Sequence, residues 1–202
     1  IGIGLNKDMN GATQEGVGNY QITTHGGQRM SSSRAYLWPI KGRKNLTIIK
    51  NALASRVLIK DKKAYGVEYL KSGKKQQVFA DCEVILSAGS INSPHLLQLS
   101  GVGPKNTLKQ ASVSIVHESP AVGENLQDHL GVSYFYKSKV PTLNDQLRPL
   151  IGKIYQGLRY ICARTGPLSL SVNQSGGFIR TRDTLEKPNI QLYFSPVSYS
   201  LE

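Results

Sequence analysis

The residues with the clearest capacity for chemistry lie between positions 83 and 104, where an apolar run leads into small residues and then into a helical pattern. The run over 83–87 is nearly continuously apolar, which is typical of a strand buried on both faces. It ends at Ala88, Gly89 and Ser90, whose small side chains would let the backbone approach a ligand closely. Free N–H groups at such a turn favour an anion such as a diphosphate. Because the same pattern also occurs as plain packing, it indicates a candidate nucleotide-facing turn and no more.

A helix is expected directly after this turn. Ser93 is suited to cap its amino terminus, Pro94 fits the first helical position, and Gly101 can end it. Strand, small-residue turn and helix together form the βα unit of a nucleotide-binding sheet, which binds ligands beyond the carboxyl end of the strand.

The histidines invite an acid–base assignment. We expect His95 to be a partly exposed helix residue, and His129 to take part in a structural hydrogen bond with Asp128 or with the backbone. His25 and His117 lie in polar stretches without obvious partners. No serine, histidine and acid follow the order of a nucleophile elbow, so this motif is not predicted here.

The elements that would position the turn change in character along the chain. The first forty residues are rich in Gly, Ser, Thr, Asn and Gln, with a strand predicted over 20–24 and a short helix over 31–37. Short runs rich in Val, Ile and Tyr, separated by polar turns, then predict an antiparallel meander within 46–80, with strands at 46–50, 55–60, 65–70 and 76–80.

A second change of character follows position 128. Strands are expected over 132–137, 177–181 and 189–195, and a helix over 144–164 that Pro149 and Gly152 disturb. The predicted fold class is therefore mixed α/β or α+β. We expect residues 1–130 to form one domain, with the meander at 46–80 and the strand–turn–helix at 83–100, and residues 131–202 to form a second.

The net charge of +12 is local, because residues 41–75 hold eleven Lys or Arg and two acids. Lysines at hairpin tips and edge strands guard against pairing with neighbouring molecules, which is the favoured interpretation. The alternative is a surface for nucleic acid or anionic lipid. Cys82 and Cys162 have no metal-ligand spacing and are expected to be reduced thiols, although a disulfide stays open. No apolar run has the length of a membrane span, and the first residues do not resemble a signal peptide.

Residues 87–103 closely resemble the second signature of the glucose-methanol-choline (GMC) family of FAD-dependent oxidoreductases. Further segments are similar to other parts of that family in the same order, namely 45–48, 56–58 and 66–69 to its meander, 120–129 to its crossover segment, and 176–180 and 188–191 to strands of its substrate domain. The resemblance is nearest to bacterial members that act on choline or other alcohols.

The resemblance implies part of a Rossmann-like FAD-binding domain followed by part of a sheet-and-helix substrate domain. It implies oxidation of a primary alcohol, choline-like or aliphatic, by hydride transfer to the flavin. By motif position, Ala88, Gly89 and Ser90 would lie against FAD, and Ala54 would meet it through its backbone, although the family usually has Val there. Asn173 and Gln174 match a substrate-facing strand.

The resemblance also predicts that this chain is an internal piece of a longer enzyme, inactive by itself and with FAD weakly bound or absent. The family's Gly-x-Gly-x-x-Gly segment has no counterpart here, and neither does its catalytic histidine, so the resemblance predicts no catalytic residue in this chain. A small-molecule alcohol is the expected partner and nucleic acid is not. The protein is expected to be cytoplasmic, with peripheral contact with the inner membrane left open. The alternatives are a binding module that uses the basic stretch, and a structural domain with a disused nucleotide fold.

Overall fold

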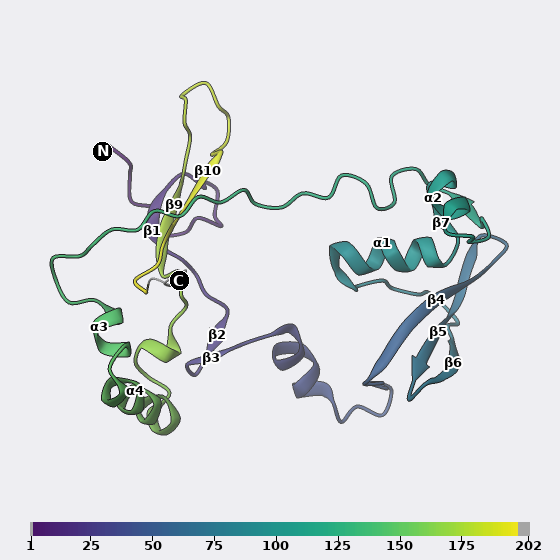
Figure 1. The fold of residues 1–202 in the computed structure, drawn as a ribbon, viewed down its shortest axis with the longest axis horizontal. Coiled ribbons are helices and arrows are strands. Elements are labelled where there is room, and N and C mark those ends of the chain that lie inside the picture. Colours follow the sequence, from purple (N-terminus) through teal and green to yellow (C-terminus); the bar gives the residue numbers. More distant parts are fainter. Residues whose placement is uncertain (1, 198–202) are drawn as a thin grey trace. The chain divides into compact units, whose positions relative to one another are not determined.

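The computed structural model describes residues 2–197. Within them the chain divides into two compact units, one formed by 44–132 and the other by 1–43 together with 133–202 (Figure 1). The second boundary lies close to the single boundary expected from the sequence. The first was not expected, because residues 1–43 join the carboxy-terminal segment by strand pairing. Whether the two units correspond to a FAD-binding and a substrate-binding domain stays a prediction.

The unit of residues 44–132 contains the predicted meander. Strands β4 (Ala52–Lys60), β5 (Lys63–Lys71) and β6 (Lys74–Phe79) pair antiparallel in the order β4-β5-β6. Two-residue turns join them, and φ is positive at both central residues of each turn, at Asp61 and Lys62 and at Ser72 and Gly73. This is the geometry of type I′ turns, whose twist matches that of the strands. The antiparallel meander is therefore confirmed, but its predicted first strand at 46–50 is irregular chain and β4 begins at Ala52.

Helices of this unit share a small core with the meander, and the first of them packs on β4. They are α1 (Gly89–Leu99) and α2 (Lys105–Gln110), with the short parallel pair β7 (Val102–Gly103) and β8 (His117–Glu118) beside them. The buried apolar side chains here are Val57, Leu58, Leu96 and Leu108, of which Leu108 is 1% exposed. Gly101 ends α1 as predicted, with φ +85. A side chain there would meet the Ser114 carbonyl, so glycine is required.

The predicted buried strand over 83–87 is wrong for this chain. The segment forms no regular secondary structure and pairs with no strand among the described residues, and Ile85 is 75% exposed. An apolar run becomes a buried strand only when neighbouring strands flank it, and the sequence pattern cannot show where those neighbours lie. The start predicted for α1 is also wrong. The helix begins at Gly89, so Pro94 lies inside it and not at its first position. The Ser93 hydroxyl accepts a hydrogen bond from the Ala88 N–H at 3.0 Å.

The other unit is built on an antiparallel sheet with the order β1-β9-β10. Its strands are β1 (Gly16–Asn19), β9 (Ser175–Ile179) and β10 (Ile190–Phe194), and a hairpin of β2 (Thr24–His25) and β3 (Gln28–Arg29) follows β1. The strands expected over 177–181 and 189–195 are thus present with shifted bounds. The strand expected over 20–24 falls mostly in the connection between β1 and β2, and no strand forms over 132–137.

Short helices complete this unit. They are the π-helix η1 (Ser33–Leu37), the 3-10 helices η2 (Trp38–Ile40) and η3 (Pro167–Ser169), and the α-helices α3 (Leu143–Leu147) and α4 (Leu150–Ala163). Pro149 separates α3 from α4, as expected, whereas the disturbance expected at Gly152 is absent, because Gly152 lies inside α4. A capping box between Thr142 and Asp145 begins α3, and the hydrogen bonds of the Thr142 hydroxyl and N–H lower the pKa of the Asp145 carboxyl.

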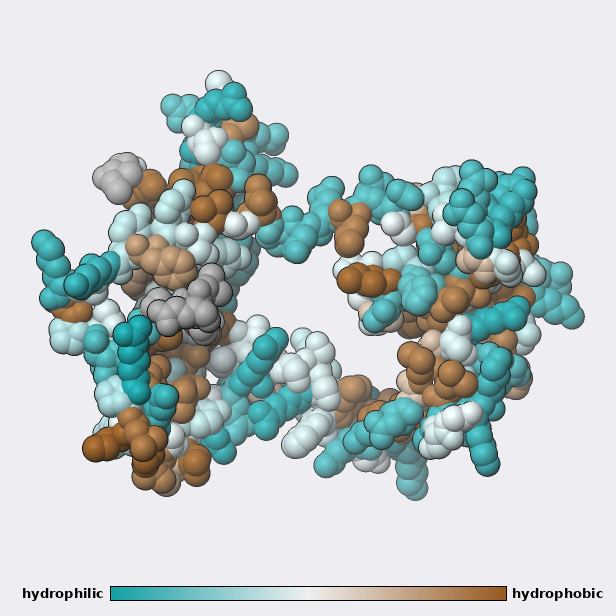
Figure 2. All heavy atoms as spheres, viewed as in Figure 1, coloured by the Kyte–Doolittle hydropathy of each residue, from teal (hydrophilic) through white to brown (hydrophobic). Residues whose placement is uncertain are grey.

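Helix α4 keeps much of its apolar surface exposed. Five of its aliphatic side chains are more than half exposed, namely Leu150, Ile151, Ile154, Leu158 and Ile161. Figure 2 shows hydrophobic side chains gathered over this helix, at the lower left of the view. The helical spacing expected from the sequence is therefore present, but within the described residues it does not produce a buried face.

Candidate functional site

The predicted cofactor-facing turn is the amino terminus of α1. Ala88, Gly89 and Ser90 are all exposed there, and no side chain caps the helix. Gly89 has φ +91, and a Cβ added to it would meet no atom within 4 Å. The first N–H groups of an α-helix have no partner inside the helix, and they carry its partial positive charge. The turn is therefore open to an anion from outside the chain.

Ala54 lies on β4 of the same unit, and α1 packs against this strand. The side chain of Ala54 is exposed, and the pairing of β4 with β5 is irregular between Ala54 and Arg56. A bulge of this kind removes backbone groups from the strand ladder and leaves them available to other partners. The structure thus brings together, within one unit, the helix and the strand that carry the predicted cofactor residues.

Ser100 fixes the contact between α1 and β4. Its side chain is buried, with the residue 2% exposed, and its hydroxyl accepts a hydrogen bond from the Val57 N–H at 2.8 Å while donating one to the Leu96 carbonyl at 2.6 Å. Ser100 is part of the segment that resembles the family signature, but its type and spacing gave no sign of this role. Only the packing of helix on strand shows it.

The histidines take no part in this arrangement. His95 is exposed on α1, as expected, and His25 and His117 are exposed on short strands. The Asp128 carboxylate does accept a hydrogen bond beside His129, but the donor is the His129 backbone N–H, at 2.8 Å, and not the imidazole. The prediction that this chain supplies no catalytic residue stays a prediction.

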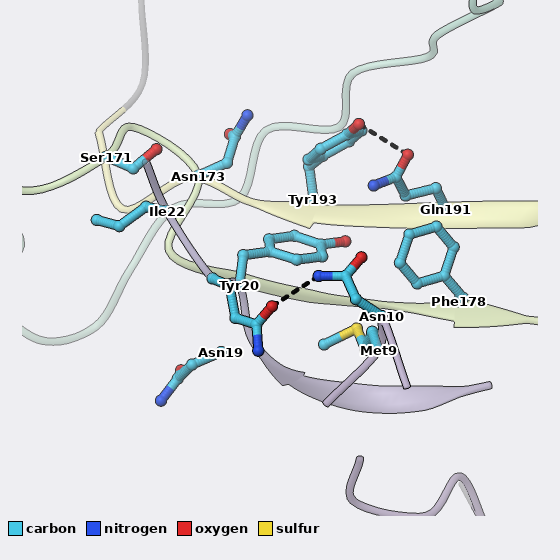
Figure 3. A pocket seen from close by; sticks show the side chains of 11 residues that line it. Met9, Asn10, Asn19, Tyr20, Ile22, Ser171, Asn173, Phe178, Gln191 and Tyr193 are labelled. Atoms are coloured by element: carbon cyan, nitrogen blue, oxygen red, sulfur yellow. Dashed lines mark hydrogen bonds between the residues drawn. The ribbon is translucent and has the colours of Figure 1, made fainter. Parts of the chain in front are cut away.

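A pocket of about 320 Å³ lies in the other unit, beside the β1-β9-β10 sheet (Figure 3). Asn173 lines this pocket, together with Phe178 of β9 and with Gln191 and Tyr193 of β10. Gln174 is not among the lining residues. Its backbone carbonyl accepts a hydrogen bond from the Tyr20 N–H at 2.9 Å and so holds the end of β1 beside the pocket.

The polar side chains of the pocket are linked by hydrogen bonds (Figure 3). The Asn10 amide donates to Gln21 at 2.7 Å, and the Tyr193 hydroxyl donates to Gln191 at 2.8 Å. The Tyr20 ring contacts two other rings, with centroids 6.3 Å from Phe178, edge to face, and 5.8 Å from Tyr193. These contacts fix the wall of the pocket before any ligand enters.

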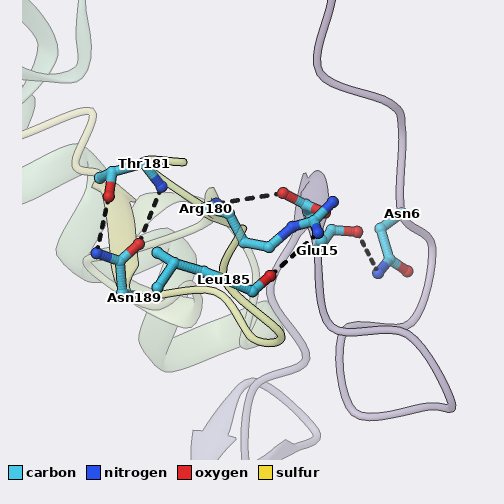
Figure 4. A network of polar contacts seen from close by, with 6 residues as sticks. All are labelled: Asn6, Glu15, Arg180, Thr181, Leu185 and Asn189. Atoms are coloured by element: carbon cyan, nitrogen blue, oxygen red, sulfur yellow. Dashed lines mark hydrogen bonds and ion pairs between the residues drawn. The ribbon is translucent and has the colours of Figure 1, made fainter. Parts of the chain in front are cut away.

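An ion pair joins the ends of the sheet that carries this pocket (Figure 4). Arg180, just after β9, lies 2.7 Å from the Glu15 carboxylate, just before β1, and its Nε donates to the same carboxylate at 2.8 Å. The hydrogen bond from Arg180 holds the pKa of Glu15 below its ordinary value, and the same bond raises the pKa of Arg180. The pair secures the pairing of β1 with β9 across 165 positions of sequence.

Lysines of the basic stretch lie beside the hairpin turns of the meander, as the favoured interpretation of the charge predicts. Lys60 and Lys63 flank one turn of the meander, and Lys71 and Lys74 flank the other. Lys75 also lies 3.6 Å from Glu68. This is the arrangement of solvated hairpin ends. Both cysteines are free and exposed, as expected.

Residues 2–197 hold no group of His, Cys, Asp or Glu that could bind a metal ion. None of their helices has the length and apolar character that a membrane span requires.

Comparisons with known proteins found similar sequences. The chain is 48% identical to an oxygen-dependent choline dehydrogenase of Photobacterium profundum, over 95% of this chain and 34% of that protein. It is 44% identical to an alcohol dehydrogenase [acceptor] of Pseudomonas putida, over 96% of this chain and 36% of that protein. The chain thus spans about a third of the length of the curated relatives it matches.

Solved structures show the same relationship. A FAD-dependent oxidoreductase from Chaetomium thermophilum is 27% identical, with a TM-score of 0.67 over 76% of this chain and 28% of that one. None of these similarities supports a binding module built on the basic stretch. A family model described as GMC oxidoreductase matches residues 1–131, which is more than half of the chain. The chain belongs to the GMC oxidoreductase family.

Proposed function

We propose that this chain is part of a FAD-dependent oxidoreductase that oxidises a primary alcohol, and that Ala88, Gly89 and Ser90 contact the cofactor. The observation that carries the proposal is the open amino terminus of α1, which is exposed and uncapped and has free space where a Gly89 side chain would be. Family membership supplies the chemistry, because FAD-dependent enzymes are among the solved structures that this chain resembles.

The residues present fit one part of FAD in particular. Unpaired N–H groups at a helix amino terminus favour a diphosphate, and a small residue with positive φ lets the backbone approach it closely. Ala54 would contribute backbone groups from the bulge on β4, the strand that α1 packs against. When bound, FAD supplies the hydride acceptor for alcohol oxidation. The role of the chain here is to bind the cofactor and to hold α1 and β4 in a fixed relation through Ser100.

The substrate part of the proposal depends on Asn173 and Gln174. Asn173 would face the alcohol, because it lines the pocket beside the sheet. Gln174 would act as a positioning residue, because its carbonyl holds the end of β1 at the edge of that pocket. The names of the relatives, choline dehydrogenase and alcohol dehydrogenase, support a small alcohol as the substrate.

The test uses the full-length protein expressed from its complete reading frame. We expect it to purify with flavin absorbance near one FAD per chain, and to reduce an artificial dye when an alcohol is added. In a Ser90→Glu variant the new carboxylate would repel the diphosphate at the helix terminus. Like charges about 4 Å apart near a protein surface repel by about 4 kcal/mol, so a loss of FAD affinity of roughly tenfold or more is expected.

A matched control adds the same charge elsewhere in the unit. Thr107→Glu places a carboxylate in the first turn of α2, where the side chain is exposed and far in sequence from the proposed contact. It should leave FAD content unchanged. A full-length protein without flavin would refute the proposal, and equal FAD content in the two variants would refute the role given to residues 88–90. Cytoplasmic location, with or without contact with the inner membrane, stays a prediction that cell fractionation checks.

A further inference from the structure

The first turn of α1, which is proposed to meet FAD, forms against local preference. Sequence signals favour a helix that starts at Ser93 and Pro94, but α1 begins one turn earlier, at Gly89. The extra turn places Pro94 inside the helix, where proline removes a backbone hydrogen bond, and it gives Ser93 a helical backbone that a residue before proline disfavours. Its first residue, Gly89, has φ +91. Backbone that departs from local preference in this way clusters at functional sites.

A single side chain ties the extra turn to the residue before it. Ala88 is the N-cap of α1, and its methyl group cannot cap a helix. The Ser93 hydroxyl accepts a hydrogen bond from the Ala88 N–H instead, at 3.0 Å. A serine inside a helix more often bonds the carbonyl four residues earlier, whereas this one is the acceptor for a backbone donor five residues earlier. The bond therefore closes a ring around the extra turn, from residue 88 to residue 93.

The same bond decides which backbone donors are left for an anion. The first four N–H groups of a helix have no acceptor inside it, and in α1 these belong to residues 88–91. Because Ser93 supplies an acceptor to Ala88, the remaining donors are the N–H groups of Gly89, Ser90 and Ile91. Three successive donors on one turn suit a phosphate group. Ala88 then contributes its small side chain to the contact, and not its N–H.

The conformation of Gly89 depends on the closed ring. With residues 88 and 93 joined, the backbone between them has little freedom, and Gly89 takes a φ that residues with a side chain rarely adopt. The turn is thus formed by contacts within the chain, so a ligand does not have to order it. Such preorganisation raises affinity, because binding no longer carries the cost of ordering the backbone.

We propose that Ser93 is a positioning residue for the cofactor, and that its hydroxyl holds residues 88–91 in the conformation that receives the FAD diphosphate. This inference rests on the proposed function, since it assumes that the turn meets FAD. Ser93 itself touches neither cofactor nor substrate in this role. It acts through the backbone of Ala88 and Gly89.

The FAD affinity of the full-length protein tests the proposal. Apoprotein is titrated with FAD, and the flavin fluorescence gives the dissociation constant. Ser93→Ala should raise this constant by roughly fivefold, the equivalent of one hydrogen bond, whereas Ser93→Thr keeps a hydroxyl and should stay within about twofold of wild type. Ser114→Ala removes an exposed hydroxyl from the same unit and should change nothing. Unchanged affinity in Ser93→Ala, or a threonine variant as weak as the alanine variant, overturns the proposal.

A second substitution separates positioning from general stabilisation. Gly89→Ala puts a side chain on a residue with φ +91, so it should weaken FAD binding while the Ser93 bond holds that conformation. In Ser93→Ala the turn can relax, and Gly89→Ala should therefore cost less affinity there, by roughly threefold. Effects that simply multiply would show that Ser93 does not act through the turn, and would overturn the proposal.

The flavin content of the wild type distinguishes the two ways to fail. A wild type without FAD refutes the proposed function, and this inference with it. A wild type with FAD, together with Ser93→Ala that binds FAD as tightly, leaves the proposed function standing and refutes only the role of Ser93. Hydrogen exchange of a peptide that contains Ala88 checks the bond itself: exchange should be faster in Ser93→Ala than in Ser93→Thr, and equal rates would count against the proposal.

Discussion

Replacing Ser100 by alanine should loosen α1 from β4. In the structure the Ser100 hydroxyl is the acceptor for the Val57 N–H, and Val57 is itself 4% exposed. Ser100→Ala removes that acceptor and leaves a buried donor without a partner. The Leu96 carbonyl loses less, because the Ser100 N–H still donates to it at 3.1 Å.

The size of the destabilisation follows from the Val57 N–H, which loses its acceptor, since the Leu96 carbonyl keeps a donor. A buried N–H that loses its partner costs about 1–3 kcal/mol, whereas exposed substitutions stay within about 0.5 kcal/mol. We therefore expect Ser100→Ala to lower the free energy of unfolding by about 2 kcal/mol. Because α1 carries Ala88, Gly89 and Ser90 at its other end, FAD affinity in the full-length protein should fall as well.

Urea unfolding followed by far-ultraviolet circular dichroism measures the first effect, and hydrogen exchange of β4 peptides locates it. Ser114→Ala is the matched control, since Ser114 is exposed in the same unit and only its backbone carbonyl contacts Gly101. If Ser100→Ala unfolded at the same urea concentration as Ser114→Ala, and hydrogen exchange in β4 did not increase, the Ser100 hydroxyl would not be the group that holds α1 to β4.

Three further predictions concern the core, the ion pair and the sheet. Leu108→Ala should lower the free energy of unfolding by about 2–5 kcal/mol in urea melts, because Leu108 is 1% exposed and its removal leaves a cavity. Glu15→Gln should destabilise at neutral pH only. The folded-state pKa of Glu15 is lowered by Arg180, so its stabilisation is present above its ordinary pKa of about 4.3 and is lost as pH falls through the folded value. Thermal melts of wild type and Glu15→Gln should therefore converge on acidification, and a constant gap would contradict the assignment. Gly176→Ala should disrupt the pairing of β9 with β10, because a Cβ would collide with the Leu192 carbonyl and with the Tyr20 side chain; loss of hydrogen-exchange protection in both strands would show it.

The sequence predicted the meander well because its information is local. Alternating apolar residues and two-residue turns rich in Lys, Ser and Gly fix strand length and turn type within about ten residues. The end of α1 at Gly101 is local in the same sense, since only glycine fits that backbone conformation without strain. The break between α3 and α4 at Pro149 follows from the missing N–H of proline.

The sequence failed where partners are distant. Residues 83–87 have the composition of a buried strand, but among the described residues no strand pairs with them, because strand formation depends on neighbours that composition cannot identify. Likewise, nothing local shows that β1 pairs with β9, since Gly16 lies opposite Phe178 and the glycines of both strands show only that something approaches closely. The pairing of the amino-terminal segment with β9 was therefore not expected from the sequence.

By itself, the sequence determined the family and the local elements, because motif and turn signals lie within a few residues of one another. Only the tertiary structure decided that the amino-terminal strand β1 pairs with β9, that Ser100 ties α1 to β4, and that Asn173 lies with Asn10 and Gln191 around one pocket. These facts depend on contacts between residues far apart along the chain. Such contacts are set by packing and hydrogen bonding in three dimensions, which residue type and spacing do not encode.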